Sequence, residues 1–154
     1  MPRMQYRTEP FEHIVMRDGV VVVAVDDRRR VGLVRHTLPP HGEVLSMPGG
    51  LVEPGEEPPA AAVRELAEET GLTAGTWQPM GTFAPMPRST QLLHLFEAAD
   101  LTHGRPCPEP SEIAQGMTLE WWPPEDALAA LWDGQLKLSG SALALLAYTT
   151  RRAR

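Results

Sequence analysis

The alternation of apolar and polar blocks along the chain predicts short strands separated by turns. Residues 19–26 form a valine-rich run bounded by charge, and a second apolar stretch at 31–34 follows a polar turn. Together they predict a β-hairpin within a sheet. Leu45 and Met47 predict another short strand, and further apolar runs predict strands at 77–83, 92–98 and 119–122.

A helix is predicted at residues 58–70, because prolines occupy its first positions and Gly71 follows its last. Two more helices are expected at 124–132 and 139–150. The segments 38–55, 84–91 and 102–116 are rich in proline, glycine or polar residues and predict loops. Since no repeat, low-complexity tract or linker divides the chain, we expect one mixed α/β domain over residues 1–154.

The 58–70 helix carries Glu65, Glu68 and Glu69 within an arc of roughly 100°. The other side of this helix is expected to pack on the sheet, through Ala60, Val63, Leu66 and Ala67. Clustered carboxylates repel one another, and the macrodipole disfavours acids near a helix C-terminus. Such hard oxygen ligands suit Mg²⁺ or Mn²⁺. A solvated acidic face is the alternative from the cluster alone.

The negative charge of the chain is concentrated in one segment. Residues 50–72 hold six acids and one base, a net −5 of the chain's −6. A pocket built there would repel phosphates unless divalent cations intervened. The basic runs at 28–30 and 151–154 are short and lack interleaved aromatics, which argues against duplex nucleic acid as a partner.

Cysteine usage and hydropathy indicate a cytoplasmic protein. The single cysteine, Cys107, cannot form an internal disulfide and is expected to be a small buried residue. The apolar runs are too short to span a bilayer, and the N-terminus lacks the features of a signal peptide. We therefore expect neither a membrane protein nor a secreted one.

Residues 50–72 spell GLVEPGEEPPAAAVRELAEETGL. The spacing is Gly, five residues, Glu, seven residues, Arg-Glu, an aliphatic residue, any residue, Glu-Glu, any residue, Gly and an aliphatic residue. This resembles the Nudix box, with every fixed position filled. The resemblance implies a Nudix fold, a βαβα sandwich with a mixed sheet between helices. It also implies Mg²⁺-dependent hydrolysis of a phosphoanhydride bond in a small-molecule nucleotide, with Mn²⁺ as another usable ion.

The resemblance assigns roles within the box. Glu65, Glu68 and Glu69 match the principal metal ligands, and the backbone carbonyl of Gly49 is a further candidate. Four residues are expected to brace the box: Glu56 and Arg64 through an ion pair, Gly50 through a tight turn, and Gly71 as the helix cap. Direct metal ligation by Glu56 stays equally open.

The proton of the attacking water would be removed by a carboxylate. The candidates are Glu69 in the box and Glu112 or Glu109 in the 102–116 loop, and Glu68 completes the catalytic group. The loop acids are equally consistent with surface charges.

Around the box the chain is most similar to the ADP-ribose pyrophosphatase branch, in the segments 33–40, 84–91 and 93–98. It departs from that branch at Leu38 (Arg before Pro), at Ser46 (Glu before the Pro-Gly of the box loop) and at Pro85-Met86-Pro87 (Ser-Pro-Gly). Leucine cannot bind a diphosphate as arginine does. Arg35 or Arg88 could substitute, and His36 lies on an expected pocket rim.

ADP-ribose, or another nucleoside diphosphate sugar, is the leading substrate on this resemblance. The alternatives are a nucleoside triphosphate pyrophosphatase that removes oxidised nucleotides, and a sensor domain that binds a nucleotide without hydrolysing it. A sensor would be expected to lose box carboxylates, and this chain keeps them. Members of the branch often dimerise through the region before Gly19, which is short here, so a homodimer stays open.

Overall fold

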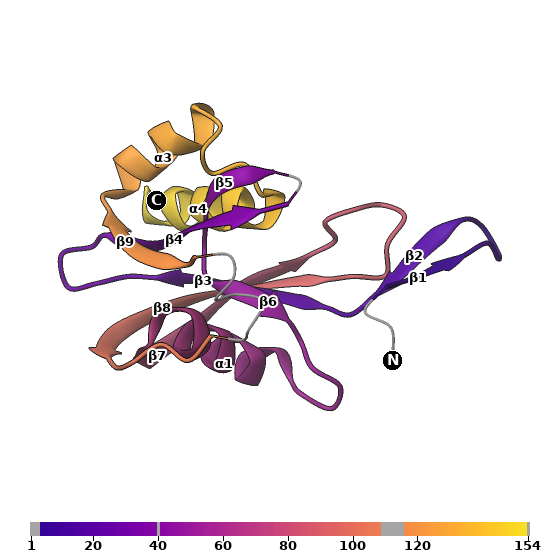
Figure 1. Ribbon diagram of the computed structural model, residues 1–154, viewed down its shortest axis with the longest axis horizontal. Helices are drawn as coiled ribbons and strands as arrows, with labels where there is room; N and C mark the ends of the chain where they lie inside the picture. Colours follow the sequence, from indigo (N-terminus) through magenta and orange to yellow (C-terminus); the bar gives the residue numbers. More distant parts are fainter. Residues whose placement is uncertain (1–3, 40, 109–115, 154) are drawn as a thin grey trace.

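The computed structural model describes residues 4–39, 41–108 and 116–153 (Figure 1). The strands in chain order are β1 (Met4–Arg7), β2 (His13–Met16), β3 (Gly19–Ala24), β4 (Val31–Leu38), β5 (Gly42–Ser46), β6 (Gly49–Leu51), β7 (Leu72–Phe83), β8 (Leu93–His103) and β9 (Thr118–Trp122). The helices are α1 (Pro58–Thr70), α3 (Pro124–Trp132) and α4 (Ser139–Arg152).

A mixed four-stranded sheet lies at the centre, in the order β6-β3-β8-β7. Within it, β3 runs parallel to β8, and the other two pairings are antiparallel. Helix α1 packs on one face and α4 on the other (Figure 1). An antiparallel sheet, β5-β4-β9, lies beside the α4 face. The predicted mixed sheet between helices is confirmed.

Strand β3 is buried on both faces, which explains its unbroken run of β-branched residues. Val20 and Val22 pack in the cluster that includes Leu66 of α1. Val21 and Val23 pack in the second cluster, with residues of α3 and α4. Hydrophobic packing on both faces therefore holds β3, the strand next to the box, in place.

The predicted hairpin of residues 19–26 and 31–34 is wrong as a pairing. A single bridge, Val25 to Val31, joins the two segments, and the strands belong to different sheets. Both edges of β3 are taken by β6 and β8, and both edges of β4 by β5 and β9. Hydrophobic patterning shows that a strand is buried but not which neighbour covers its edge.

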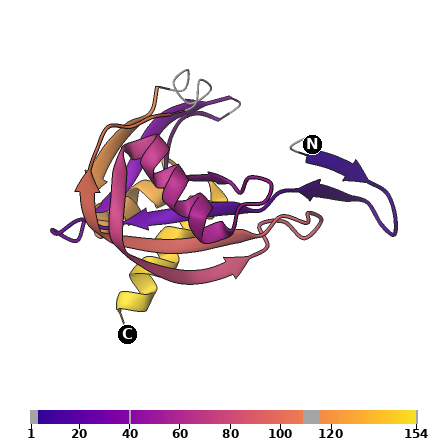
Figure 2. The ribbon, with the colours of Figure 1, turned by 90° about the horizontal axis from the view of Figure 1, so that it is seen from below.

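The N-terminal strands β1 and β2 form a separate two-stranded sheet that sequence patterning did not predict. This hairpin projects from the rest of the chain in both ribbon views (Figures 1 and 2). Its large apolar side chains, Met4, Tyr6 and Phe11, are exposed.

The composition led to two expectations, one about membrane-spanning segments and one about the burial of Cys107. No helix among the described residues is long and apolar enough to cross a membrane. Cys107 is exposed, so the prediction that it is buried is wrong. Its backbone N–H instead donates to the carbonyl of Glu68, 3.0 Å away, which holds the segment after β8 against the end of α1.

Candidate active site

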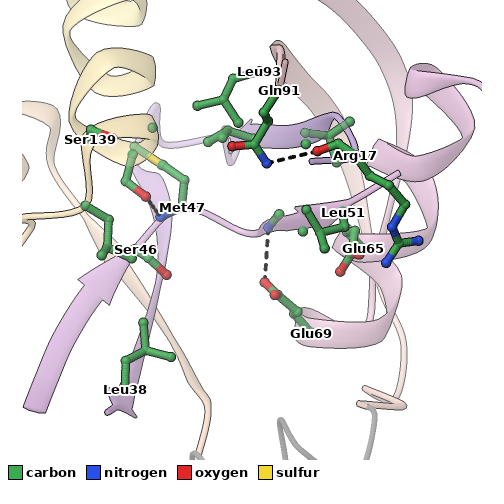
Figure 3. Close-up of a pocket in the computed structure, with 18 of the residues that line it drawn as sticks. Arg17, Leu38, Ser46, Met47, Leu51, Glu65, Glu69, Gln91, Leu93 and Ser139 are labelled. Carbon is green, nitrogen blue, oxygen red and sulfur yellow. Dashed lines mark hydrogen bonds between the residues drawn. The ribbon is translucent and has the colours of Figure 1, made fainter. Parts of the chain in front are cut away.

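A cavity of about 480 Å³ opens between α1, the β5–β6 segment and the start of α4. Figure 3 shows its two sides: Glu65, Glu69 and Leu51 lie on one, and Ser46, Met47 and Leu38 on the other. The cavity therefore joins the predicted metal-binding helix to a wall built by the other sheet.

Helix α1 begins and ends where its sequence predicts. Proline occupies its first turn, and Gly71 ends it in the left-handed region (φ 74°), with its N–H donating to the carbonyl of Ala67 over 2.9 Å. The first turn carries no side-chain cap.

The helix is rotated relative to the expected orientation. Its buried residues are Ala61, Ala62, Glu65, Leu66 and Thr70. Leu66 is buried as predicted, but Ala60 is exposed and Val63 is 45% exposed, so the prediction that these two pack on the sheet is wrong. Glu65 shares the buried side with Leu66 and keeps only 6% of its surface exposed. The acidic and packing faces overlap because a glycine backbone, at Gly50, lies opposite Glu65.

The two glycines before the box loop allow close approach rather than a special backbone angle. A Cβ atom at Gly50 would overlap the carboxyl group of Glu65, and one at Gly49 would overlap the carbonyl oxygen of Val20. Any side chain at Gly50 would displace the Glu65 carboxylate from the cavity.

Arg64 ties the box loop to the helix. Its Nε donates to Oε1 of Glu56 and its Nη2 to Oε2, each over 3.0 Å, and Nη2 also reaches the carbonyl of Leu51. Its Nη1 donates to Glu65 over 2.8 Å and to Glu68 over 3.0 Å. These contacts engage every N–H of the guanidinium.

The charges of this network reinforce one another. Hydrogen bonding from Arg64 lowers the pKa of Glu56, and the carboxylate of Glu56 in turn is the largest cause that raises the pKa of Arg64. Glu56 also accepts the backbone N–H of Glu53. The geometry is that of an ion-pair brace between loop and helix.

The three predicted metal ligands are close in the fold but not equivalent. Glu65 and Glu69 line the cavity, and Oε2 of Glu69 accepts the N–H of Gly49 over 3.2 Å. Glu68 is not among the described residues that line the cavity, and it accepts a hydrogen bond from Arg64. In the described part of the chain, no three acid, histidine or cysteine side chains are gathered closely enough to hold an ion together. Arg64 Nη1 stands between the carboxylates of Glu65 and Glu68.

The donor set nevertheless fits a hard divalent cation. All its members are oxygens, which Mg²⁺ prefers. The glycine at position 50 leaves room for a carboxylate beside the backbone.

The predicted substrate-binding residues are divided by strand alternation. His36 lines the cavity and is 7% exposed. Its neighbour Arg35 points to the other face of β4, where it pairs with Glu120 over 2.6 Å and with Glu43 over 3.1 Å. The hydrogen bond from Arg35 lowers the pKa of Glu120.

Arg88 is exposed. Its backbone carbonyl accepts a hydrogen bond from the N–H of Ile14. Neither Arg35 nor Arg88 is among the described residues that line the cavity. Glu109 and Glu112 lie outside the described residues.

Arg17, which the sequence pattern did not predict as a site residue, lines the cavity. Its Nη1 donates to the carbonyl of Val52 over 3.2 Å and to Glu53 over 2.7 Å. Gln91 supports it through a hydrogen bond to the Arg17 carbonyl (Figure 3). The sequence did offer one sign of this role, because Arg17 lies two residues before β3, the buried strand next to the box.

Comparison with known proteins shows which family the chain belongs to. A family model described as the NUDIX domain matches residues 15–139. The chain belongs to the Nudix family. Residues 50–72 are therefore the Nudix box of this family, and the helix of the box lies between the mixed sheet and the cavity.

Several curated relatives are similar to this Nudix chain. A CMP-5'-(N-acetyl-N-hydroxy-3-aminopropyl)phosphonate hydrolase of Streptomyces rubellomurinus is 31% identical over 140 residues, which are 88% of this chain and 66% of the relative. An ADP-ribose pyrophosphatase of Mycobacterium tuberculosis is 34% identical over 142 residues, 86% of this chain and 66% of the relative. The Nudix chain thus spans slightly less than two thirds of the length of both.

A solved structure described as an ADP compounds hydrolase has the same fold. It superposes with a TM-score of 0.78 at 23% identity, covering 92% of this chain and 76% of that one. At this identity the likeness establishes the Nudix fold, α/β with mixed sheets, and nothing about the substrate.

Proposed function

We propose that this Nudix protein hydrolyses the phosphoanhydride bridge of a nucleoside diphosphate linked to another moiety, with ADP-ribose as the leading substrate. The observation that carries the proposal is the placement of Glu65 and Glu69 in a cavity where Gly50 makes room for carboxylate oxygens. Two relatives, one named for a CMP-linked phosphonate and one for ADP-ribose, support this substrate class.

Glu65, Glu68, Glu69 and the carbonyl of Gly49 would hold Mg²⁺. The bound ion would neutralise phosphate oxygens and lower the pKa of a water. Glu69 is then placed to take the proton from the attacking water, while the N–H of Gly49 fixes its carboxylate. Glu112 and Glu109 stay as alternative bases.

Arg64 cannot bind the substrate without leaving its carboxylate partners. Arg17 can, because only its Nη1 has hydrogen-bond partners among the described residues. Its Nε and Nη2 carry three further N–H donors. We assign Arg17, which lines the cavity, to a non-bridging phosphate oxygen of the substrate.

A second candidate is hydrolysis of a nucleoside triphosphate. A putative 8-oxo-dGTP diphosphatase of Bacillus subtilis is 32% identical over 106 residues, 69% of this chain. The two reactions differ in product: a diphosphate sugar yields a nucleoside monophosphate and a sugar phosphate, whereas a triphosphate yields a monophosphate and pyrophosphate.

The test is a substrate panel with Mg²⁺: ADP-ribose, ADP-glucose, UDP-glucose, dGTP and 8-oxo-dGTP, with products separated by ion exchange. The proposal predicts monophosphate and sugar phosphate from the diphosphate sugars. Faster pyrophosphate release from the triphosphates would replace it with the second candidate. Tight nucleotide binding without turnover of any compound would make the chain a sensor.

We also propose that the projecting β1–β2 hairpin packs against a second copy of the chain. A two-stranded hairpin is marginally stable in water unless its apolar side chains are covered. Met4, Tyr6 and Phe11 are each at least 59% exposed in the single chain. A homodimer would bury them.

A further inference from the structure

His36 and Ser46 form a buried polar pair on the cavity wall opposite α1. His36 Nε2 and Ser46 Oγ are 2.8 Å apart, and the residues are 7% and 6% exposed. They lie on one face of neighbouring strands, because Val34 pairs with Ser46 and His36 pairs with Val44. Figure 3 shows Ser46 across the cavity from Glu65 and Glu69.

The surroundings of this pair are apolar. Leu38 and Met47 lie beside Ser46 in the cavity wall (Figure 3), and the lining also includes the apolar residues Met117 and Leu138. A buried polar group in such a wall destabilises the fold unless its hydrogen-bonding capacity is used. A hydroxyl has one donor and two acceptor positions, and the bond to His36 is the only one that Ser46 makes among the described residues. Ser46 therefore retains capacity for a ligand atom.

The pair lies within reach of a nucleotide bound at the proposed reaction centre. Gly49, whose N–H contacts Glu69, follows Ser46 by three residues, and three residues span at most about 11 Å. The opposite end of the cavity is polar instead, with Arg17, Glu53 and Gln91. An apolar wall with a small polar feature suits a nucleobase, whereas the polar end suits a sugar and its phosphate.

We propose that Ser46, oriented by His36, contacts the polar edge of the substrate's nucleobase and determines which base is accepted. Leu38 and Met47 would pack against the base while the diphosphate reaches α1. This assignment rests on the proposed function for its substrate class. A wall built to hydrogen-bond one base edge leaves its polar group unpaired with another, which is a strong basis for discrimination.

The test measures base preference in two ways. Affinities for AMP, GMP, CMP and UMP are determined by calorimetry, and kcat/KM is determined for ADP-, GDP-, CDP- and UDP-glucose. Wild type is expected to prefer one base by at least about tenfold. Ser46→Ala should reduce that preference to within about threefold, because the base edge loses its hydrogen-bond partner.

Three further variants separate recognition from folding. Ser46→Cys keeps the shape and weakens the hydrogen bond, so it should fall between wild type and Ser46→Ala. Ser46→Thr keeps the hydroxyl and should keep the preferred base. Thr37→Ala removes an exposed side chain on the other face of β4 and should leave preference and turnover unchanged.

The outcomes distinguish this assignment from the proposed function. Hydrolysis of all four sugars with no base preference in wild type, or an unchanged preference in Ser46→Ala, overturns the assignment and leaves the hydrolase proposal standing. A base preference in monophosphate binding that Ser46→Ala abolishes, with no hydrolysis of any compound, supports the assignment and overturns the proposed function.

Discussion

The carboxylate of Glu65 occupies the space that a side chain at position 50 would need, so Gly50 and Glu65 are complementary across the sheet and helix. The contact explains how an acid can lie on the buried side of α1. It also holds the box loop close against helix α1, in addition to the hydrogen bonds that Arg64 donates to Glu56 and to the carbonyl of Leu51.

Gly50→Ala should therefore inactivate the enzyme by displacing Glu65. We expect kcat/KM on the best substrate to fall by more than tenfold, a barrier increase above about 1.4 kcal/mol, together with weaker Mg²⁺ activation. Gly134→Asn is the control, because its side chain would enter open space at a φ of 78° that asparagine tolerates. Wild-type activity in Gly50→Ala would show that the contact is dispensable.

Glu69→Gln should fold normally, because a carboxamide oxygen can still accept the N–H of Gly49. It should lose most of its turnover, since an amide neither takes a proton nor neutralises a cation. Steady-state kinetics and a thermal melt measure both effects. Retention of more than about a tenth of the wild-type kcat, a barrier rise below about 1.4 kcal/mol, would remove Glu69 from the catalytic group.

Arg17→Met should raise KM or lower kcat/KM by about tenfold, because the phosphate loses a charged donor while the aliphatic stem is kept. Arg88→Met is the matched control and should change kcat/KM by less than about twofold, since Arg88 is exposed outside the cavity lining. Equal effects of the two substitutions would contradict the assignment of Arg17.

Removing the ion pair between Glu56 and Arg64 should change how the free energy of unfolding depends on pH in the acid range. The folded-state pKa of Glu56 is below its ordinary value of 4.5, so this stabilisation is complete above that value and is lost as pH falls through the lowered pKa. Urea unfolding from pH 6 downward should therefore show a shallower loss of stability in Glu56→Gln than in wild type. Glu57→Gln, a substitution of the neighbouring exposed acid, should follow the wild-type curve. Coincident slopes for Glu56→Gln and wild type would rule out the linkage.

The projecting hairpin predicts a concentration-dependent dimer. Sedimentation of wild type should show two copies, and the double substitution Tyr6→Ser with Phe11→Ser should shift the equilibrium to one copy. Turnover per chain then shows whether the second copy contributes to the site. A wild type that sediments as a single chain at every concentration would exclude this role for the hairpin.

The sequence predicted α1 and its end at Gly71 because these depend on local chemistry: proline in the first turn, glycine after the last. It placed Glu65 on a metal-binding face opposite the packing side of the helix, whereas the structure buries Glu65 beside Leu66. The glycine at position 50, across the fold, leaves space for that carboxylate, and Arg64 supplies the opposite charge. Such a contact joins residues that no local pattern connects.

Among the cationic candidates, the sequence could not choose between neighbours on one strand. Side chains alternate along β4, so that His36 faces the cavity and Arg35 faces Glu120. Which of the two faces the cavity depends on the sheet that β4 joins. The pairing of β4 with β5 and β9 is a long-range choice. Arg17 could not be predicted for a similar reason, because it contacts the box at Val52 and Glu53, which are distant from it in the sequence.

The most direct test of the account is manganese anomalous scattering from crystals soaked with Mn²⁺ and a non-hydrolysable methylene analogue of ADP-ribose. The account predicts an anomalous peak in the cavity, coordinated by carboxylate oxygens of Glu65, Glu68 and Glu69 and lying against the analogue's phosphates. An analogue bound in the cavity with no peak beside these glutamates, and with Arg64 still bridging Glu65 and Glu68, would contradict it.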